Sequence, residues 1–356
     1  MHNTSTDYKR IIVRLPNWVG DVVMATPTLR CLRRHFPNAR IDVTLIPYVR
    51  KIIEGTPWFD NIIEYSPNGE HAGMGGFLKY VRRLRRENYD LALVLPNSFS
   101  SALLMFLTGA GRRVGYGRQG RGFLLTDPVT PPTENGKFVP QPMVEYYLRL
   151  CEEIGATAPS IKTELFVDSA SEQRADELFA RYHIGRGDAI VAINPGAAYG
   201  SSKLWNPARF AEVVDTLVER EGCDIVLLGA PHERKVVQAI VAAARSEFAN
   251  LSEEDVELDL LKSIIKRCDL LITVDSGPRH FAVAFDKPVV VLMGPTDPRY
   301  TDCNTEKTII LRVDGLACAP CHIKECPTEH ECMTGITSEM VVRAATQLLA
   351  KYVKKS

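Results

Sequence analysis

The sequence predicts an α/β protein built from two doubly wound domains in tandem. A chain of 356 residues exceeds what one compact core usually holds and suits two domains. Short β-branched runs alternate with segments of helical apolar spacing, and this alternation is typical of parallel sheets covered by helices. Apolar residues make up 45% of the chain and charged residues 24%, which excludes a disordered or collagen-like protein.

The first domain is expected to span residues 1–168. Its first strand, 10–15, stops at Pro16, and a helix opens at Gly20 and ends near Phe36. Further strands are expected at 41–46, 61–65, 91–95 and 162–167, with helices at 77–87 and 143–154. The stretch 126–142 is rich in proline and has no periodic pattern, so we expect a loop there.

The second domain is expected to span residues 186–336, after a link at Gly185-Arg186-Gly187. The same alternation continues here, and a last helix at about 338–354 has no strand after it. The expected strands are 189–193, 224–228, 270–274 and 288–292, and the expected helices are 207–221, 231–246, 258–267 and one from Gly277.

Charge is distributed unevenly along the chain. Basic and acidic residues balance at 43 each, yet residues 1–125 hold 18 Lys and Arg against 9 Asp and Glu. We therefore expect the first domain to meet an anionic partner, such as a phosphorylated lipid or nucleic acid. No apolar run is long enough to span a bilayer, and the polar start Met1 to Arg10 does not fit a signal peptide. We expect a cytosolic protein with reduced cysteines that docks on a membrane surface.

Four predicted strands of the second domain are followed by glycine and polar residues. Ligands of open α/β sheets bind beyond the carboxyl ends of the strands, so these loops are candidates for a binding site. Each loop alone has a structural explanation, such as a helix start or a proline-fixed turn, but four on one rim favour a nucleotide diphosphate. The loops are Asn194–Lys203, Gly229–Glu233, Asp275–His280 and Gly294–Pro298.

Several candidate residues have both a structural and a functional interpretation. The small, flexible loop that ends in Lys203 could bind a phosphate through its backbone N–H groups. Alternatively, it is a plain strand-to-helix connection with a solvated lysine. Glu233 is an acid in the first turn of a helix, or a partner of ribose hydroxyls. Asp275 could accept sugar hydroxyl protons, and His280 could face the same ligand or be a buried histidine. In the first domain, Asp21 is a helix N-cap or a general base.

The sequence resembles family 9 glycosyltransferases, the lipopolysaccharide heptosyltransferases. The resemblance is carried by the segments Pro16–Asp21, Leu95–Phe99 with Ser101–Leu103, Asn194–Trp205, Asp275–His280 and Gly294–Pro298. The Leu95–Leu103 segment favours type II over type I. The resemblance implies a GT-B fold, in which two Rossmann-like domains face a central cleft and the last helix, 337–356, packs back on the N-terminal domain. It implies an inverting, metal-independent transfer of L-glycero-D-manno-heptose from ADP-heptose to the first heptose of heptosyl-Kdo2-lipid A. The N-terminal domain then binds this acceptor at the cytoplasmic face of the inner membrane, and no cofactor or nucleic acid takes part.

By this match Asp21 is the base and Lys203 holds the diphosphate. The candidate donor-binding residues are Gly196, Ser201, Ser202, Lys203, Glu233, Asp275, Ser276, Gly277, His280 and Thr296. The candidate acceptor-binding residues are Asn17, Trp18, Asn97, Ser98, Arg118 and Arg121. Two positions depart from the family pattern: Pro278-Arg279 stands where Leu-Met is usual, and Asn206 replaces a proline.

The tail holds four cysteines, Cys318, Cys321, Cys326 and Cys332, with His322 and His330 between them. They could bind zinc or an iron–sulfur cluster, but the spacing is not a standard zinc pattern, so we expect reduced thiols without a metal.

Three further classes stay open: a heptosyltransferase of type I or III, a GT-B sugar-nucleotide epimerase, and a non-catalytic binding protein. A dinucleotide dehydrogenase is disfavoured, because no Gly-x-Gly-x-x-Gly follows a predicted strand.

Overall fold

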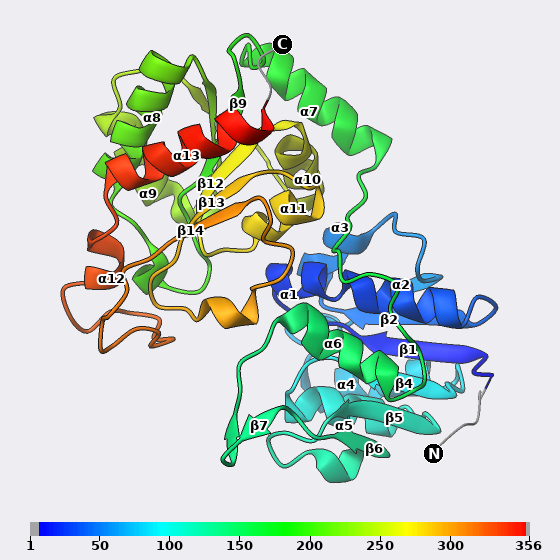
Figure 1. The fold of residues 1–356 in the computed structure, drawn as a ribbon. Coiled ribbons are helices and arrows are strands. Elements are labelled where there is room, and N and C mark those ends of the chain that lie inside the picture. Colours follow the sequence, from blue (N-terminus) through cyan, green and yellow to red (C-terminus); the bar gives the residue numbers. More distant parts are fainter. Residues whose placement is uncertain (1–6, 354–356) are drawn as a thin grey trace. The chain divides into compact units, whose positions relative to one another are not determined.

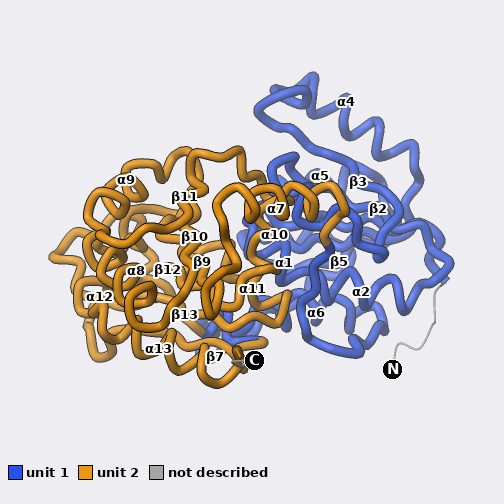
Figure 2. Tube along the Cα trace, turned by 90° about the horizontal axis from the view of Figure 1, so that it is seen from above, with its two compact units in different colours: residues 1–166, 299–303 blue, residues 167–298, 304–356 orange. Residues whose placement is uncertain are grey.

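The computed structural model describes residues 7–353, so the first part of the expected polar start and the last three residues of the expected C-terminal helix lie outside it. The chain divides into two compact units (Figure 2). The first holds the described residues up to Phe166 together with Arg299–Cys303, and the second holds Val167–Pro298 and the residues from Asn304 onward. No helix in the described part is long and apolar enough to cross a membrane.

The first unit contains a six-stranded sheet in the order β3-β2-β1-β4-β5-β6, with every neighbouring pair parallel (Figure 1). Its strands are β1 (Arg10–Arg14), β2 (Arg40–Leu45), β3 (Asn61–Glu64), β4 (Leu91–Val94), β5 (Arg112–Tyr116) and β6 (Asp127–Val129). Its helices are α1 (Val19–Met24), α2 (Thr26–His35), α3 (Arg50–Ile53), α4 (Gly73–Arg85), α5 (Phe99–Leu107) and α6 (Met143–Glu152), with 3₁₀ turns η1 (Pro47–Val49) and η2 (Gly122–Leu124).

The second unit repeats the same topology, with the parallel order β11-β10-β9-β12-β13-β14. Its strands are β9 (Ile190–Asn194), β10 (Asp224–Leu227), β11 (Ala249–Asn250), β12 (Leu270–Val274), β13 (Val289–Leu292) and β14 (Thr308–Leu311). Its helices are α7 (Ser169–Arg181), α8 (Pro207–Glu221), α9 (Arg234–Ala243), α10 (Leu258–Arg267), α11 (Pro278–Ala284), α12 (Glu331–Thr334) and α13 (Ser338–Tyr352), with 3₁₀ turns η3 (Ser201–Lys203) and η4 (Pro231–Glu233). The 3₁₀ turn η5 (Pro298–Tyr300) begins at the last residue before the segment Arg299–Cys303 of the first unit. Two doubly wound parallel sheets confirm the predicted fold class.

The central strands form because their side chains are buried on both faces of each sheet. Ile11, Ile12 and Val13 of β1 are fully buried, as are Val191 and Ile193 of β9. Burial of one such side chain stabilises the fold by roughly 1.5–3 kcal/mol, which explains the continuous apolar runs in the sequence.

Several local expectations were wrong, each for a physical reason. The single helix expected from Gly20 is two helices, because Pro27 stands at the start of α2, where its missing N–H costs nothing. The loop at 126–142 contains β6, which pairs with β5, and the short hairpin β7 (Thr133–Glu134) and β8 (Lys137–Phe138). Residues 162–167 are not a strand. The edge strands β11 and β14 were missed, since pairing between distant segments leaves little trace in a local pattern.

The segment around the expected link also differs. Helix α7 was not expected; it begins after Asp168, whose carboxylate accepts a hydrogen bond of 2.8 Å from the backbone N–H of Ser171. The helix belongs to the second unit, where Lys266 of α10 pairs with Glu172 at 2.8 Å. Gly185–Gly187 therefore lie within this unit, and the division falls between Phe166 and Val167.

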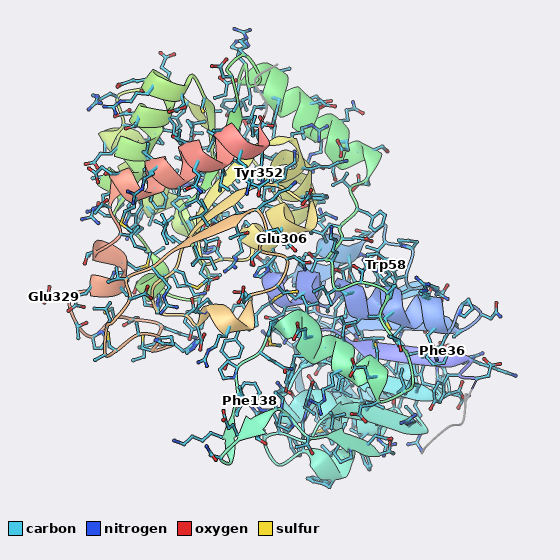
Figure 3. The ribbon with its side chains drawn as sticks, viewed as in Figure 1. Phe36, Trp58, Phe138, Glu306, Glu329 and Tyr352 are labelled. Atoms are coloured by element: carbon cyan, nitrogen blue, oxygen red, sulfur yellow. The ribbon has the colours of Figure 1, made fainter. Side chains whose placement is uncertain are left out.

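The last helix, α13, belongs to the second unit. Its buried face of Val341, Ala344, Ala345, Leu348 and Leu349 joins the core that packs under α8 and the sheet. Near its end, the Tyr352 hydroxyl donates a 3.1 Å hydrogen bond to the carbonyl of Glu306, and Figure 3 labels both residues. An apolar face this wide finds its partner in the adjacent core, which fixes where the helix packs.

Candidate functional site

Both sheets have a switch point where the strand order reverses, and the candidate residues follow the strands beside it. In the second unit the switch lies between β9 and β12, and in the first between β1 and β4. The loops after β10, β9, β12 and β13 leave four adjacent strands at one edge, as the sequence predicted. Ligands of doubly wound sheets bind in the crevice at such a point, so each unit presents one candidate ligand edge.

A buried carboxylate with two cations lies at the centre of the second unit's edge. Asp275 Oδ1 accepts a hydrogen bond of 2.6 Å from Nη1 of Arg279, and Oδ2 accepts one of 2.9 Å from Nζ of Lys203. Lys203 Nζ also donates to the backbone carbonyl of Asp275 at 2.8 Å, and the Thr296 hydroxyl donates to Oδ2 at 2.7 Å. The side chains of Lys203 and Asp275 are each 12% exposed, while that of Arg279 is 1% exposed.

These contacts set the charges of the site. Burial alone would raise the pKa of Asp275, but the positive charges of Arg279 and Lys203 outweigh it and hold that pKa well below its usual range. Removal from solvent, followed by repulsion from Arg279, lowers the pKa of His280 to about 3. Two cations, one carboxylate and a neutral histidine leave one surplus positive charge at neutral pH, which suits an anionic ligand.

Other predicted donor residues meet through Asn194 and Glu233. Asn194 Nδ2 donates to Ser276 Oγ at 3.1 Å and to the carbonyl of Gly196 at 3.1 Å, which ties the loops after β9 and β12 together. The Glu233 carboxylate accepts a 2.8 Å hydrogen bond from the N–H of Ala230, and burial raises its pKa. A Cβ at Gly196 would lie 1.9 Å from Glu233 Cδ, so a side chain there would displace the Glu233 carboxylate from this position. Gly277 is the N-cap of α11, as the helix-start prediction requires.

The loop before Lys203 is held by the cysteine-containing tail. Ser202 Oγ donates to the carbonyl of Ile323 at 2.6 Å, and the Tyr199 hydroxyl donates to the carbonyl of His322 at 2.6 Å. A Cβ at Gly200 would lie 2.3 Å from the carbonyl oxygen of Lys324. The buried Ser202 therefore anchors the loop, whereas Ser201 is exposed.

The four tail cysteines are free thiols. Among the described residues, no group of three or more His, Cys, Asp and Glu side chains is arranged to hold a metal ion.

In the first unit, Asp21 is the third residue of α1, and the N-cap is Trp18, so the N-cap reading of Asp21 is wrong. The phenol of Tyr147, a buried residue of α6, donates a 2.9 Å hydrogen bond to Asp21 Oδ1. Burial, together with the negative charge of Asp21, raises the pKa of Tyr147 well above its ordinary value. Tyr147 therefore stays a hydrogen-bond donor to this carboxylate at neutral pH.

The expected acceptor residues fall into two groups. Asn17 and Trp18 are exposed, and Arg118 stacks on Phe138 with its guanidinium carbon 4.0 Å from the ring centroid. Asn97 accepts a 3.1 Å hydrogen bond from the Tyr146 hydroxyl.

Ser98 and Arg121 are already engaged within the first unit. Ser98 caps α5, accepting a hydrogen bond of 3.3 Å from the N–H of Ser101. Arg121 is fully buried and donates to the carbonyls of Tyr116, Pro96 and Ser98, so it braces this loop and offers no exposed charge.

A model of glycosyltransferase family 9 (heptosyltransferase) matches residues 77–331, more than half of the chain. This chain belongs to glycosyltransferase family 9. It is 30% identical over 312 residues to the Escherichia coli K12 protein "Lipopolysaccharide heptosyltransferase 2", covering 85% of this chain and 88% of the relative. It is 29% identical over 352 residues to "Lipooligosaccharide heptosyltransferase 2" of Haemophilus influenzae, covering 96% and 99%. The solved structure of E. coli ADP-heptose lps heptosyltransferase II matches with a TM-score of 0.78 at 27% identity, over 97% of this chain and 100% of that one.

The structure explains two positions at which this family 9 protein departs from the family pattern, Asn206 and Arg279. Asn206, which replaces a proline, caps α8 by accepting a 2.9 Å hydrogen bond from the N–H of Ala208. Arg279 points into the interior and pairs with Asp275.

Sequence reasoning missed Tyr147 because its apolar helical spacing is typical of a core residue. It also missed Arg14, which is buried and donates a 2.7 Å hydrogen bond to Asn17 Oδ1; a charge inside an apolar strand was the available signal.

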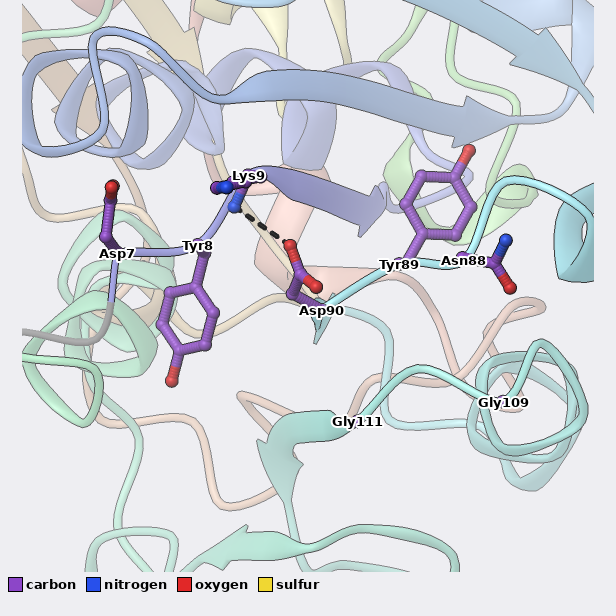
Figure 4. Close-up of a pocket in the computed structure, with 8 residues that line it drawn as sticks. All are labelled: Asp7, Tyr8, Lys9, Asn88, Tyr89, Asp90, Gly109 and Gly111. Atoms are coloured by element: carbon purple, nitrogen blue, oxygen red, sulfur yellow. Dashed lines mark hydrogen bonds between the residues drawn. The ribbon is translucent and has the colours of Figure 1, made fainter.

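A pocket of about 560 Å³ lies elsewhere in this family 9 protein (Figure 4). It lies beside the amino ends of β1, β4 and β5, where Asp90 Oδ2 accepts hydrogen bonds from the N–H groups of Lys9 and Arg10 at 2.9 and 2.8 Å. Because ligands of doubly wound sheets bind at carboxyl ends, this pocket is not part of the candidate site.

Proposed function

We propose that this protein transfers L-glycero-D-manno-heptose from ADP-heptose to the first heptose of heptosyl-Kdo2-lipid A, in the synthesis of the lipopolysaccharide core. Family membership and the names of the relatives, heptosyltransferase 2, support this substrate pair over a type I or III enzyme, an epimerase or a binding protein. The observation that carries the proposal is the group of Lys203, Arg279, Asp275 and Thr296 beside the switch point of the second sheet, whose two cations and one carboxylate leave one surplus positive charge.

The second unit binds the donor in this proposal. Lys203 turns its ammonium group to the diphosphate, and Asp275 and His280 line the sugar side. Gly196, Ser201, Ser276, Gly277 and Thr296 form the surrounding loops, and Glu233 meets the ribose. Ser202 belongs to the site only through the loop it anchors, because its hydroxyl is engaged with Ile323.

The reaction needs a base and a stabilised leaving group. Asp21 takes the proton of the acceptor hydroxyl as its oxygen attacks the anomeric carbon from the face opposite ADP. The bond between that carbon and the phosphate oxygen breaks, and its electron pair leaves on the diphosphate. Lys203 stabilises the charge that develops there, and the configuration inverts. This arrangement supplies the positive charge from the protein itself, so we propose a metal-independent transfer.

The first unit binds the acceptor. Asn17 and Trp18 follow β1 and are close in sequence to Asp21. Asn97 follows the neighbouring strand β4, and Arg118 offers a cation on the same unit. The excess of Lys and Arg in residues 1–125 matches an acceptor that carries phosphates and carboxylates. Ser98 and Arg121 contribute by holding the Asn97 loop in place.

We further propose that the protein works at the cytoplasmic face of the inner membrane, held there by one surface of the first unit. Phe99 and Phe106 of α5 and Phe123 of η2 are 45%, 43% and 73% exposed, and the rings of Phe99 and Phe123 lie 6.2 Å apart. Helix α4, which contacts α5, exposes Met74 and ends with basic residues. The exposed arginines there are Arg82, Arg83, Arg85 and Arg86. Arg113 lies over the Phe106 ring, with its guanidinium carbon 5.3 Å from the ring centroid. Exposed aromatic side chains and arginines on these elements suit an anionic bilayer surface.

The decisive experiment incubates the protein with ADP-heptose and heptosyl-Kdo2-lipid A and weighs the product. A mass gain of one heptose, with release of ADP, is the expected result. Free heptose or an isomerised donor without acceptor gain would contradict the proposal.

Membrane attachment is tested separately with vesicles. The variant Phe99→Ser/Phe106→Ser/Phe123→Ser should bind anionic phospholipid vesicles more weakly than the wild type does in sedimentation. A matched variant with Val241→Ser, at a 42% exposed residue of the second unit, should bind as the wild type does. Equal binding of all three proteins would refute this surface.

A further inference from the structure

A second buried cation shares the carboxylate that Lys203 contacts. We propose that Arg279 is a positioning residue of the donor site, a fixed counter-ion for Asp275 that lets Lys203 exchange this carboxylate for the donor diphosphate. The inference rests on the proposed donor site and deepens it. It concerns a position where the sequence departs from the pattern it otherwise resembles.

The geometry separates a fixed cation from an exchangeable one. Arg279 is 1% exposed and reaches Oδ1 of Asp275 from the adjacent turn of α11, four residues along the chain. Lys203 comes from η3 in the loop after β9, is 12% exposed, and reaches Oδ2. An ion inside the core cannot move to a ligand at the edge, whereas a lysine on a loop can swing its flexible stem.

Asp275 keeps partners on both oxygens after Lys203 leaves. Oδ1 retains the 2.6 Å bond from Arg279, and Oδ2 retains the 2.7 Å bond from Thr296. A buried carboxylate that loses its partners costs several kcal/mol or takes up a proton, and Arg279 prevents both. Arg279 itself stays unavailable to the donor, and its Nε has no hydrogen-bond partner among the described residues.

Charge counting supports the same assignment. The groups that face Asp275 are Arg279, Lys203 and the Thr296 hydroxyl, with a neutral His280 nearby. With methionine at position 279, Lys203 and Asp275 would neutralise each other, and binding of a diphosphate would have to break that pair. With Arg279 present, the three groups together carry one positive charge in excess, which favours binding of the anionic diphosphate.

Calorimetry of ADP binding tests the inference. Wild type and Arg279→Met are titrated with ADP at neutral pH in buffers of different ionisation enthalpy, which reveals protons taken up on binding. The wild type should bind without proton uptake. Arg279→Met should bind at least about 10-fold more weakly, because Lys203 must leave a carboxylate without its charge-assisted partner. Its binding should take up protons, approaching about one per ADP as Asp275 protonates.

Two further variants keep the test decisive. The double variant Arg279→Met/Asp275→Asn carries no stranded carboxylate; it should fold even where Arg279→Met does not, and should bind ADP without proton uptake. As a control, Arg267→Met removes an arginine of α10 that pairs with Asp176 of α7 at 2.7 Å. This variant should leave ADP binding unchanged.

The inference is overturned if Arg279→Met binds ADP as the wild type does without proton uptake, or if the double variant takes up protons. A wild type that binds ADP as described but transfers no heptose would contradict the proposed function and leave the role of Arg279 standing.

Discussion

The phenol of Tyr147 donates a hydrogen bond of 2.9 Å to Asp21, a residue 126 positions earlier in the chain. Helices α1 and α6 contact each other, so this bond fixes the carboxylate through a buried side chain of a second helix. A base that is held in one orientation needs less reorganisation when the acceptor hydroxyl arrives.

Replacing Tyr147 by phenylalanine should slow heptose transfer while leaving donor affinity intact. The variant keeps the packing of the ring and removes one charge-assisted hydrogen bond, which is worth roughly 1.5–3 kcal/mol. If that whole energy acts in the transition state, kcat falls by about 10- to 150-fold. Steady-state kinetics, with ADP affinity measured in parallel, checks this. As a control, Tyr182→Phe removes a comparable bond of 2.8 Å to Glu254 in the second unit and should leave kcat unchanged. An unaltered kcat in Tyr147→Phe would show that Asp21 needs no such support.

The Asp21→Asn substitution should remove most of the transfer activity but should lower the stability of the fold only slightly. The substitution removes the proposed base, a loss that typically costs 10²–10⁴-fold in rate. Asp21 lies in the first turn of α1, and a carboxylate there contributes only about 0.3–1 kcal/mol through the helix dipole. Transfer rate and thermal unfolding are measured on the same preparation. A folded variant with near wild-type turnover would mean that another group takes the proton.

Lys203→Ala should weaken ADP binding by about 10- to 150-fold, the worth of one charge-assisted contact. Asp275 keeps Arg279 and Thr296, so the fold should tolerate the change. Lys307→Ala is the matched control, because Lys307 also pairs with an aspartate, Asp286, and lies 5.4 Å from the centre of the Tyr352 ring. If calorimetry finds the same loss of ADP affinity in both variants, the effect of Lys203 comes from the overall charge of the protein and not from contact with the diphosphate.

Acid should destabilise the wild type more than Asp275→Asn. The pKa of Asp275 is held well below its ordinary value, so the unfolded chain binds a proton that the folded chain refuses. The stability that this carboxylate contributes is therefore complete above about pH 5. It is lost progressively as the pH falls below about 3.9, the ordinary value for aspartate, toward the lower pKa of the folded state. Urea unfolding at pH 7 and pH 3 should show a larger drop in the free energy of unfolding for the wild type. Equal drops in both proteins would mean that Asp275 is not stabilised by its cations.

Sequence reasoning reached the second sheet's edge because backbone pattern and chemistry coincide there. Strand β12 was predicted at 270–274 as observed, and the polar residues that follow it are those that meet Lys203 and Thr296. A parallel sheet places the ends of neighbouring strands at one edge, so residues far apart in the sequence could be grouped without knowing any contact.

The rest depended on packing between distant segments, which a linear pattern does not contain. Tyr147 carries the spacing of a core residue, and only the contact of α6 with α1 brings its hydroxyl to Asp21. Arg121 was predicted to bind the acceptor, whereas its side chain is fully buried and donates hydrogen bonds to backbone carbonyls. For α13 the sequence predicts an apolar face but does not show that this face joins the core of the second unit.

The loop before Lys203 is attached to the cysteine-containing tail through backbone atoms of the tail. Tyr199 and Ser202 donate to the carbonyls of His322 and Ile323, and every amino acid supplies such a carbonyl. Side chains at those two tail positions can therefore change during evolution without losing the attachment, while an insertion or deletion would shift the acceptors out of reach. Among homologues, the length of this tail should be preserved more strictly than its composition, and an alignment scored on residue identity alone will underrate it.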